Sequence, residues 1–192
     1  KTSGGLHGVG SSVVNALSVW LKLTSCDGSE IHYQEFVRGH YDEEMKVIGQ
    51  TDRTGTEVIF KPDGEIFEDT HFDYETLETR LREQAFLNAG LRIILRDSRD
   101  PENIREDNMY YEGGIRSFVE HIHARKKVDV VHPDVIYLSR VEENRTAEIA
   151  LQYNSDFNEL VLSFANNIHT VEGGFHEVGF KTALTRVIND YG

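Results

Sequence analysis

Apolar residues near the start of the chain change from helical spacing to strand spacing within a few positions. A broad apolar face predicts a helix that contains Val13, Val14, Ala16, Leu17, Trp20 and Leu21. Apolar residues alternate with polar ones over 21–25 and again over 31–37. Asp27-Gly28 lies between these two runs and is typical of a tight turn, so the pattern predicts a β-hairpin.

The next hundred or so positions contain the same two kinds of pattern. Strands are predicted at Val47-Ile48, over 56–60 and over 91–95. Helical spacing predicts a helix over 74–88, on the positions Leu77, Leu81, Ala85 and Phe86. The charged residues from 97 to 107 predict a loop or a domain boundary.

A second unit is predicted after this loop. Glu112-Gly113-Gly114 precedes a predicted helix with apolar residues Ile115, Phe118, Val119 and Ile122, and a short strand is expected over 135–138. Alternation over 147–153 and 160–164 predicts two strands that pair as an antiparallel hairpin. Glu172-Gly173-Gly174 then precedes a last helix. Strands and helices mix without a regular βαβ order, which indicates the α+β class.

Composition adds little to this picture. The hydrophobic share of 39% over 192 residues suits a globular protein, and the net charge of −13 gives no independent support for DNA binding. Cys26 is the single cysteine, so no internal disulfide forms. No apolar run approaches the ~20 residues of a membrane span, and no signal peptide is apparent, so the cytoplasm is expected. Both ends look cut, so we expect a fragment of a longer protein.

A glycine-rich loop is the segment most suggestive of chemistry. Glycines occupy four of the seven positions from Gly4 to Gly10, and the loop leads straight into the first predicted helix. Without side chains in the way, backbone N–H groups can approach an anion, so a polyphosphate is a natural ligand. The pattern matches neither a Rossmann fingerprint nor a P-loop. A flexible turn before a buried helix is the alternative from spacing alone.

The residues around this loop belong to a longer set of motifs. The set begins with Lys1-Thr2-Ser3-Gly4-Gly5-Leu6-His7-Gly8-Val9-Gly10 and continues through Thr54-Gly55-Thr56, Phe60-Lys61-Pro62-Asp63, 82–88, 111–115, 151–154, 164–168 and 184–189. In this order, it resembles the B subunits of bacterial type II DNA topoisomerases, namely gyrase and, as a close second, topoisomerase IV. The resemblance spans essentially the whole chain.

The resemblance implies a fold and a division into domains. Residues 1–108 would be the later part of an ATPase sandwich of the Bergerat type, shared by gyrase, Hsp90, histidine kinases and MutL. Residues 109–192 would begin a transducer domain that resembles domain 2 of ribosomal protein S5. The parent protein would be an ATP-hydrolysing DNA topoisomerase that uses ATP and Mg²⁺, binds DNA and the A subunit in an A2B2 heterotetramer, and dimerises on ATP binding.

The resemblance also assigns roles to individual residues. The phosphate-binding glycine box corresponds to Gly4, Gly5, Leu6, His7, Gly8, Val9 and Gly10. Thr56 would lie near the adenine, although a structural threonine on a sheet is an equal alternative. The family's general base and its Mg²⁺-binding asparagine would lie upstream, and its γ-phosphate lysine would lie downstream. No catalytic residue is therefore expected in this chain, which alone should be inactive.

Two positions depart from the family pattern, and other candidate sites are weak. Asp27 falls near the position of a usual arginine, and Phe175 replaces the threonine of a common Gly-Gly-Thr-His stretch. The nine histidines show no ligand spacing, so no metal site is predicted. Arg116 and the basic run 125–127 favour a solvated helix end, with a DNA-facing patch as the alternative. A non-catalytic interaction domain and a MutL-like ATPase are the alternative functions.

Overall fold

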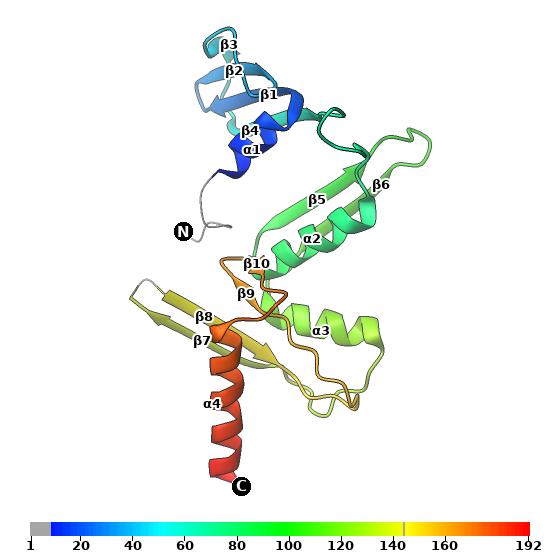
Figure 1. The fold of residues 1–192 in the computed structure, drawn as a ribbon, viewed down its shortest axis with the longest axis vertical. Helices are drawn as coiled ribbons and strands as arrows, with labels where there is room; N and C mark the ends of the chain where they lie inside the picture. The colour runs from blue at the N-terminus through cyan, green and yellow to red at the C-terminus, as the bar shows by residue number, and fades with distance from the viewer. Residues whose placement is uncertain (1–8, 144) are drawn as a thin grey trace. The chain divides into compact units, whose positions relative to one another are not determined.

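A computed structural model describes residues 9–143 and 145–192 (Figure 1). The chain forms two compact units that divide between Phe72 and Asp73. Both combine helices with antiparallel strands, as expected for the α+β class. The predicted domain limit between residues 108 and 109 falls inside a strand of the second unit, and the division at this limit stays a prediction.

The first unit is a four-stranded antiparallel sheet preceded by a short helix. Helix α1 (Gly10–Ala16) leads into β1 (Ser18–Asp27), β2 (Glu30–Val37), β3 (Lys46–Gln50) and β4 (Thr54–Pro62), in the spatial order β3-β2-β1-β4. Leu21 lies in register with Phe36 on one side and Phe60 on the other, so these side chains share one face. Lys22 and Glu35 form an ion pair of 3.8 Å on the opposite face.

The helix predicted through Leu21 is shorter than expected. α1 ends at Ala16, and Trp20 and Leu21 belong to β1. β1 is hydrogen-bonded to β2 along one edge and to β4 along the other, and these two ladders override the local helical spacing. The hydroxyl of Ser18 donates to the carbonyl of Val14 at 2.6 Å where the helix gives way to the strand.

The predicted hairpin at Asp27-Gly28 is confirmed. Gly28 has a φ of 96°, a left-handed conformation that glycine adopts without strain. One carboxylate oxygen of Asp27 accepts the backbone N–H groups of Ser29 and Glu30 at 2.8 and 2.7 Å. His32 Nε2 lies 3.1 Å from the other oxygen. These contacts lower the pKa of Asp27, and the Glu30 N–H has the largest effect.

The second unit begins with α2 (Tyr74–Leu87), which packs against the antiparallel pair β5 (Arg92–Asp97) and β6 (Arg105–Tyr110). Asp73 caps α2 by accepting the N–H of Thr76 at 2.8 Å. The loop predicted over 97–107 is too long, because β6 starts at Arg105. Charged residues of β6 have partners: the Tyr74 hydroxyl donates to Asp107 at 2.7 Å, and Arg96 lies 3.7 Å from Glu106.

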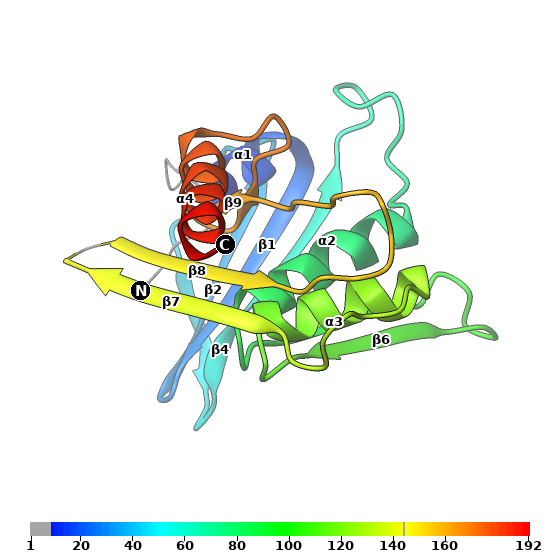
Figure 2. The same ribbon diagram turned by 90° about the horizontal axis from the view of Figure 1, so that it is seen from below.

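The remaining elements are α3 (Ile115–Lys126), β7 (Ile136–Glu142), β8 (Arg145–Leu151), β9 (Phe164–Ala165), β10 (Ile168–His169) and α4 (Phe175–Tyr191). The predicted pairing of 147–153 with 160–164 is wrong. β8 pairs with β7, and β9 pairs with β10. Figure 2 shows the β7–β8 hairpin beside α3, with which β8 makes contact. The strand predicted over 135–138 continues through polar residues to Glu142. It therefore ends close in sequence to the start of β8 and pairs with it in place of residues 160–164.

Aromatic side chains form the core of the second unit. The Phe86 ring stacks on Tyr111 and Phe118, with centroids 3.7 and 4.7 Å apart, and Phe118 lies 6.4 Å from Phe164. Phe86 is only 1% exposed. This cluster joins α2, α3 and β9 around one fully buried ring. None of the described helices is long and apolar enough to cross a membrane.

Replacing Phe86 should strongly destabilise the second unit. Phe86→Ala removes a buried ring from the aromatic cluster and leaves a cavity, so the free energy of unfolding should fall by about 3–5 kcal/mol. Chemical denaturation followed by circular dichroism measures this loss. Val141→Ala is the matched control because Val141 is 70% exposed, and it should change the free energy by less than about 0.5 kcal/mol. Equal losses in the two variants would contradict the assigned core.

The Asp27 turn should make stability depend on pH in the acid range. Because the folded-state pKa is lowered below the usual 3.8, the stabilisation from Asp27 is fully present above that value. It is lost as the pH falls through the lowered pKa. Carboxyl ¹³C NMR of folded and urea-unfolded protein should show Asp27 titrating at a lower pH in the folded form. The same midpoint in both forms would refute the assigned hydrogen bonds.

Candidate functional site

The predicted phosphate-binding loop is only partly within the described residues. Gly4, Gly5, Leu6, His7 and Gly8 lie outside them, whereas Val9 and Gly10 are described. Val9 precedes α1, and its carbonyl accepts the N–H of Val13 at 3.0 Å. A Cβ built on Gly10 would meet nothing within 4 Å, so the backbone there faces open space. The loop is thus followed directly by a helix, as the sequence predicts.

Two turns lie at the junction of α1 and β1. The backbone N–H of Asp63 donates at 3.1 Å to the carbonyl of Leu17, which directly follows α1, and that of Arg38 donates at 3.2 Å to the carbonyl of Val19 in β1. Arg38 Nε and Asp63 Oδ2 are 2.9 Å apart, so an ion pair joins the turns to each other. Gly39 lies against Ala16 with φ 81°, and a Cβ there would come within 3.3 Å of the Ala16 Cα.

This ion pair is not apparent from the sequence. Asp63 appears within the Phe-Lys-Pro-Asp stretch, but the Asp63 side chain is 4% exposed in the structure while Arg38 is 48% exposed. Arg38 also has a left-handed φ of 49°. One sequence feature does indicate the turn at Arg38: an Arg-Gly dipeptide directly follows a predicted strand, where a turn with positive φ is common.

Thr56 lies near the end of the sheet that carries the Asp27-Gly28 turn. It is exposed on β4 and directly opposite Ser25 of β1, which in turn lies opposite His32 of β2. Residues paired in this way point to the same face, so two hydroxyls and an imidazole form a polar row. Asp27, two residues beyond Ser25, lies on the same face. This row offers hydrogen-bond donors and acceptors to a ligand that approaches that face.

Asp27 introduces a fixed negative charge beside the polar row. Its carboxylate already accepts hydrogen bonds from Ser29 and Glu30, and its lowered pKa keeps it ionised near neutral pH. The resemblance leads one to expect an arginine near this position, where this chain has Asp27. This charge would disfavour an anionic group of a ligand near the turn.

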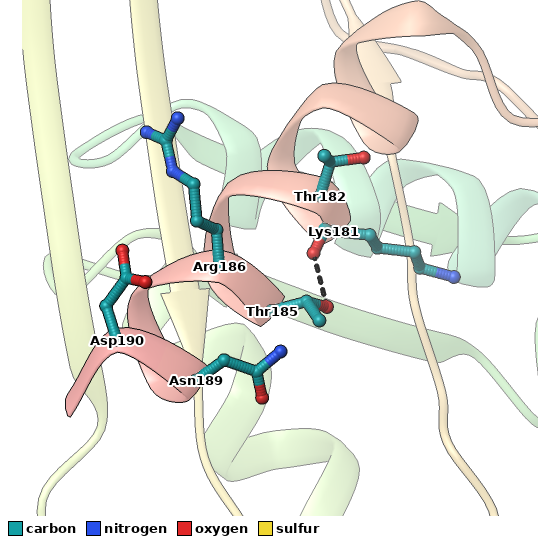
Figure 3. Close-up of a pocket in the computed structure, with 6 residues that line it drawn as sticks. All are labelled: Lys181, Thr182, Thr185, Arg186, Asn189 and Asp190. Carbon is teal, nitrogen blue, oxygen red and sulfur yellow. Dashed lines mark hydrogen bonds between the residues drawn. The ribbon is translucent and has the colours of Figure 1, made fainter. Parts of the chain in front are cut away.

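A surface hollow along α4 is a poor candidate for a binding site. Figure 3 shows its lining, which comes from this one helix: Lys181, Thr182, Thr185, Arg186, Asn189 and Asp190. The hydroxyls of Thr182 and Thr185 donate to carbonyls one turn earlier, each at 2.8 Å. Lys181 Nζ lies 2.7 Å from Glu159 and 3.1 Å from Glu177. These groups are already engaged, and no second element converges on them within the described part of the chain.

A smaller hollow of about 210 Å³ lies at the start of α3. Its lining includes Gly113, Gly114, Arg116, Tyr137 and Glu148. The Arg116 guanidinium lies 4.0 Å from the centre of the Tyr137 ring, whose hydroxyl donates to Glu148 at 2.8 Å. Arg116 is therefore engaged at the first turn of α3, whereas Arg125 and Lys126 lie in its last turn. These cations do not form one continuous basic patch on the helix.

The histidines that the structure describes do not gather into a metal site. Over 9–143 and 145–192, no group of three or more His, Cys, Asp or Glu residues is placed to hold a metal ion. His123 bonds Gln152 and Asn154 through its two ring nitrogens, at 2.8 and 3.0 Å. His121 lies against Phe86, and burial lowers its pKa. His7 lies outside the described residues.

Comparison with known proteins finds similarity to one kind of protein. A family profile described as DNA gyrase B matches residues 114–192. The DNA gyrase B protein of Staphylococcus aureus is 53% identical over 100% of this chain and 30% of the relative's length. That of Bacillus mycoides is 51% identical, over 100% of this chain and 47% of its own length. The chain thus spans less than half the length of these relatives.

A solved structure supports the same assignment. The crystal structure of the 43K ATPase domain of Thermus thermophilus gyrase B, in complex with an aminocoumarin, matches with a TM-score of 0.84. The match has 34% sequence identity and covers 96% of this chain and 50% of that one. It confirms the expected α+β fold. Both relatives match this chain from end to end at more than half identity, so the chain is similar to DNA gyrase B proteins along its whole length.

Proposed function

We propose that the chain is part of the ATPase region of an ATP-dependent type II DNA topoisomerase. The observation that carries the proposal is the 53% identity to a DNA gyrase B protein along the whole chain, including the glycine box. In this proposal the parent protein hydrolyses ATP and couples the energy to the passage of one DNA segment through another. DNA, the gyrase A protein and a second copy of the B protein are its partners, and the cytoplasm is its location.

The proposed nucleotide site uses two segments of the first unit. Backbone N–H groups of residues 4–10 surround the phosphates, where the lack of side chains permits close approach. Thr56 contributes its hydroxyl to the adenine end. Mg²⁺ accompanies the phosphates and neutralises their charge, with its protein ligand supplied from outside this chain. The polar row that includes Ser25 and Thr56 supports a hydrogen-bonding contact with the ligand.

Turnover should require more than these 192 residues. The full-length protein should hydrolyse ATP in a coupled assay, and residues 1–192 alone should not, because positioning the attacking water needs a general base. By the family resemblance this glutamate lies outside the chain. Activity of the isolated chain above that of a mock purification would contradict this division, and a full-length protein without turnover would contradict the proposed function.

Thr56 should contribute to nucleotide affinity through its hydroxyl. Thr56→Val keeps the β-branched shape suited to β4 but removes the hydrogen-bonding group. In the full-length protein we expect KM for ATP to rise about tenfold, or about 1.4 kcal/mol, which is within the range for a lost hydrogen bond. Thr56→Ser, which keeps the hydroxyl, should stay close to wild type. Equal KM values for the valine variant and the wild type would exclude Thr56 from the site.

A further inference from the structure

Three side-chain amides join the C-terminal end of α2 to the turn between β9 and β10 (Figure 1). Gln84 Nε2 donates to the Asn167 carbonyl and Asn167 Nδ2 donates to Asn88 Oδ1, each at 2.9 Å. Asn88 Nδ2 in turn donates to the Gln84 carbonyl at 2.8 Å. These three half-buried residues, which we call the amide clamp, form a closed ring of hydrogen bonds.

The amide clamp has a single arrangement of donors and acceptors. Rotating the Asn88 amide by half a turn would place its oxygen against the Gln84 carbonyl and its nitrogen against Asn167 Nδ2. Rotating the Asn167 amide would set its oxygen against Asn88 Oδ1. Asn167 also holds a left-handed φ of 65°, which asparagine adopts more readily than most residues. The turn therefore meets α2 in one orientation.

The same turn is connected to the start of α4. Thr170 follows β10, and its N–H donates to the carbonyl of Ser163, the residue before β9, at 2.8 Å. The Ser163 hydroxyl donates to Glu177, in the first turn of α4, at 3.0 Å. Among the described helices and strands none packs extensively on α4, and no residue of α4 is buried. Its direction is therefore set mainly at its N-terminal end.

We infer that the amide clamp fixes the direction of α4 relative to α2, with Asn167 as its positioning residue, and that strand passage depends on this connection. The contacts run from α2 through Asn167 and Ser163 to α4. The ring of Phe164 also brings β9 near α3. Apolar packing is non-directional, however, whereas a hydrogen bond has preferred angles. The amides therefore supply the orientation.

The dependence of strand passage rests on the proposed function. Residues 1–108 then belong to the ATPase region, and residues 109–192 belong to the part that responds to the nucleotide. The amide clamp crosses this limit, because α2 precedes it and Asn167 follows it. A loosened clamp should leave ATP hydrolysis in place but let α4 turn independently of α2. Fewer hydrolysis events should then lead to passage of a DNA segment.

The test uses full-length protein in which one amide is changed to a carboxylate. Asn167→Asp places an oxygen against Asn88 Oδ1, and Gln84→Glu places one against the Asn167 carbonyl, so each change breaks the ring. Asn166→Asp is the matched control. It makes the same chemical change in the same turn, at an exposed residue that also has a left-handed φ, of 48°.

Two measurements report on the amide clamp. Spin labels at Thr79→Cys in α2 and Val187→Cys in α4, both exposed positions, give the distance between the helices by double electron–electron resonance once the other cysteines are replaced. The second measurement is the ATP hydrolysed per strand passage, with the gyrase A protein and plasmid DNA. Both clamp variants should broaden the distance distribution and raise the ATP hydrolysed per passage about threefold or more, with kcat for ATP within about twofold of wild type. The control should match wild type in both.

The possible results separate the inference from the proposed function. An unchanged distance distribution in both clamp variants would overturn the inference. A broadened distribution with unchanged ATP per passage would overturn the dependence of strand passage on the clamp. Equal changes in Asn166→Asp and Asn167→Asp would also overturn the inference, because charge in the turn would then be the cause. If Asn167→Asp does not fold, Gln84→Glu decides, since it leaves the turn intact. Absence of ATP hydrolysis by the wild-type protein would overturn the proposed function, while the distances would still decide what holds α4.

Discussion

The pairing of β1 along both of its edges is the constraint on which the first unit depends. Because β2 and β4 are hydrogen-bonded to the same strand, they are fixed relative to each other. This places Thr56 in one row with Ser25 and His32, on three different strands. It also brings the ends of β2 and β4 to the junction of α1 and β1, where Arg38 and Asp63 meet. The polar row and this ion pair are thus two results of one sheet.

In the second unit the buried ring of Phe86 holds the elements together, as β1 does in the first unit. It does so through packing, whereas β1 acts through backbone hydrogen bonds. Hydrogen bonds add to this packing at one point. Gln84 Nε2 donates to the Asn167 carbonyl, and Asn167 Nδ2 donates to the Asn88 side chain, each at 2.9 Å. Residues of α2 are thereby connected to the turn between β9 and β10, on the other side of the predicted limit at residue 108. α2 contacts both the β5–β6 pair and α3, so contacts on the two sides of that limit are continuous.

Local features were the most predictable from the sequence. The Asp27-Gly28 turn and the helix over 74–88 depend on neighbouring residues, so their patterns were sufficient. The end of α1 was missed because two long-range ladders recruit Trp20 and Leu21 into β1. β6 was not predicted because it is rich in charged residues. These residues have partners that are distant in sequence, such as Tyr74 for Asp107.

The candidate site followed the same rule. Motif order predicts the glycine box and Thr56 as site residues, because these are contiguous stretches of sequence. The contact of Asp63 with Arg38 was not predictable, since it joins two turns separated by β3 and β4 and needs a left-handed backbone at Arg38. Pairings that depend on tertiary register do not leave a periodic pattern in the chain.

The sparse burial in α4 has a calorimetric consequence. None of its residues is buried, and Phe175 and Tyr191 are 97% and 95% exposed. The heat capacity change on unfolding arises chiefly from apolar surface that becomes newly hydrated. Melting α4 as it stands would hydrate little new surface, so this helix would contribute almost nothing to that change. Its heat absorption would come mainly from its own backbone hydrogen bonds, over a broad range of temperature.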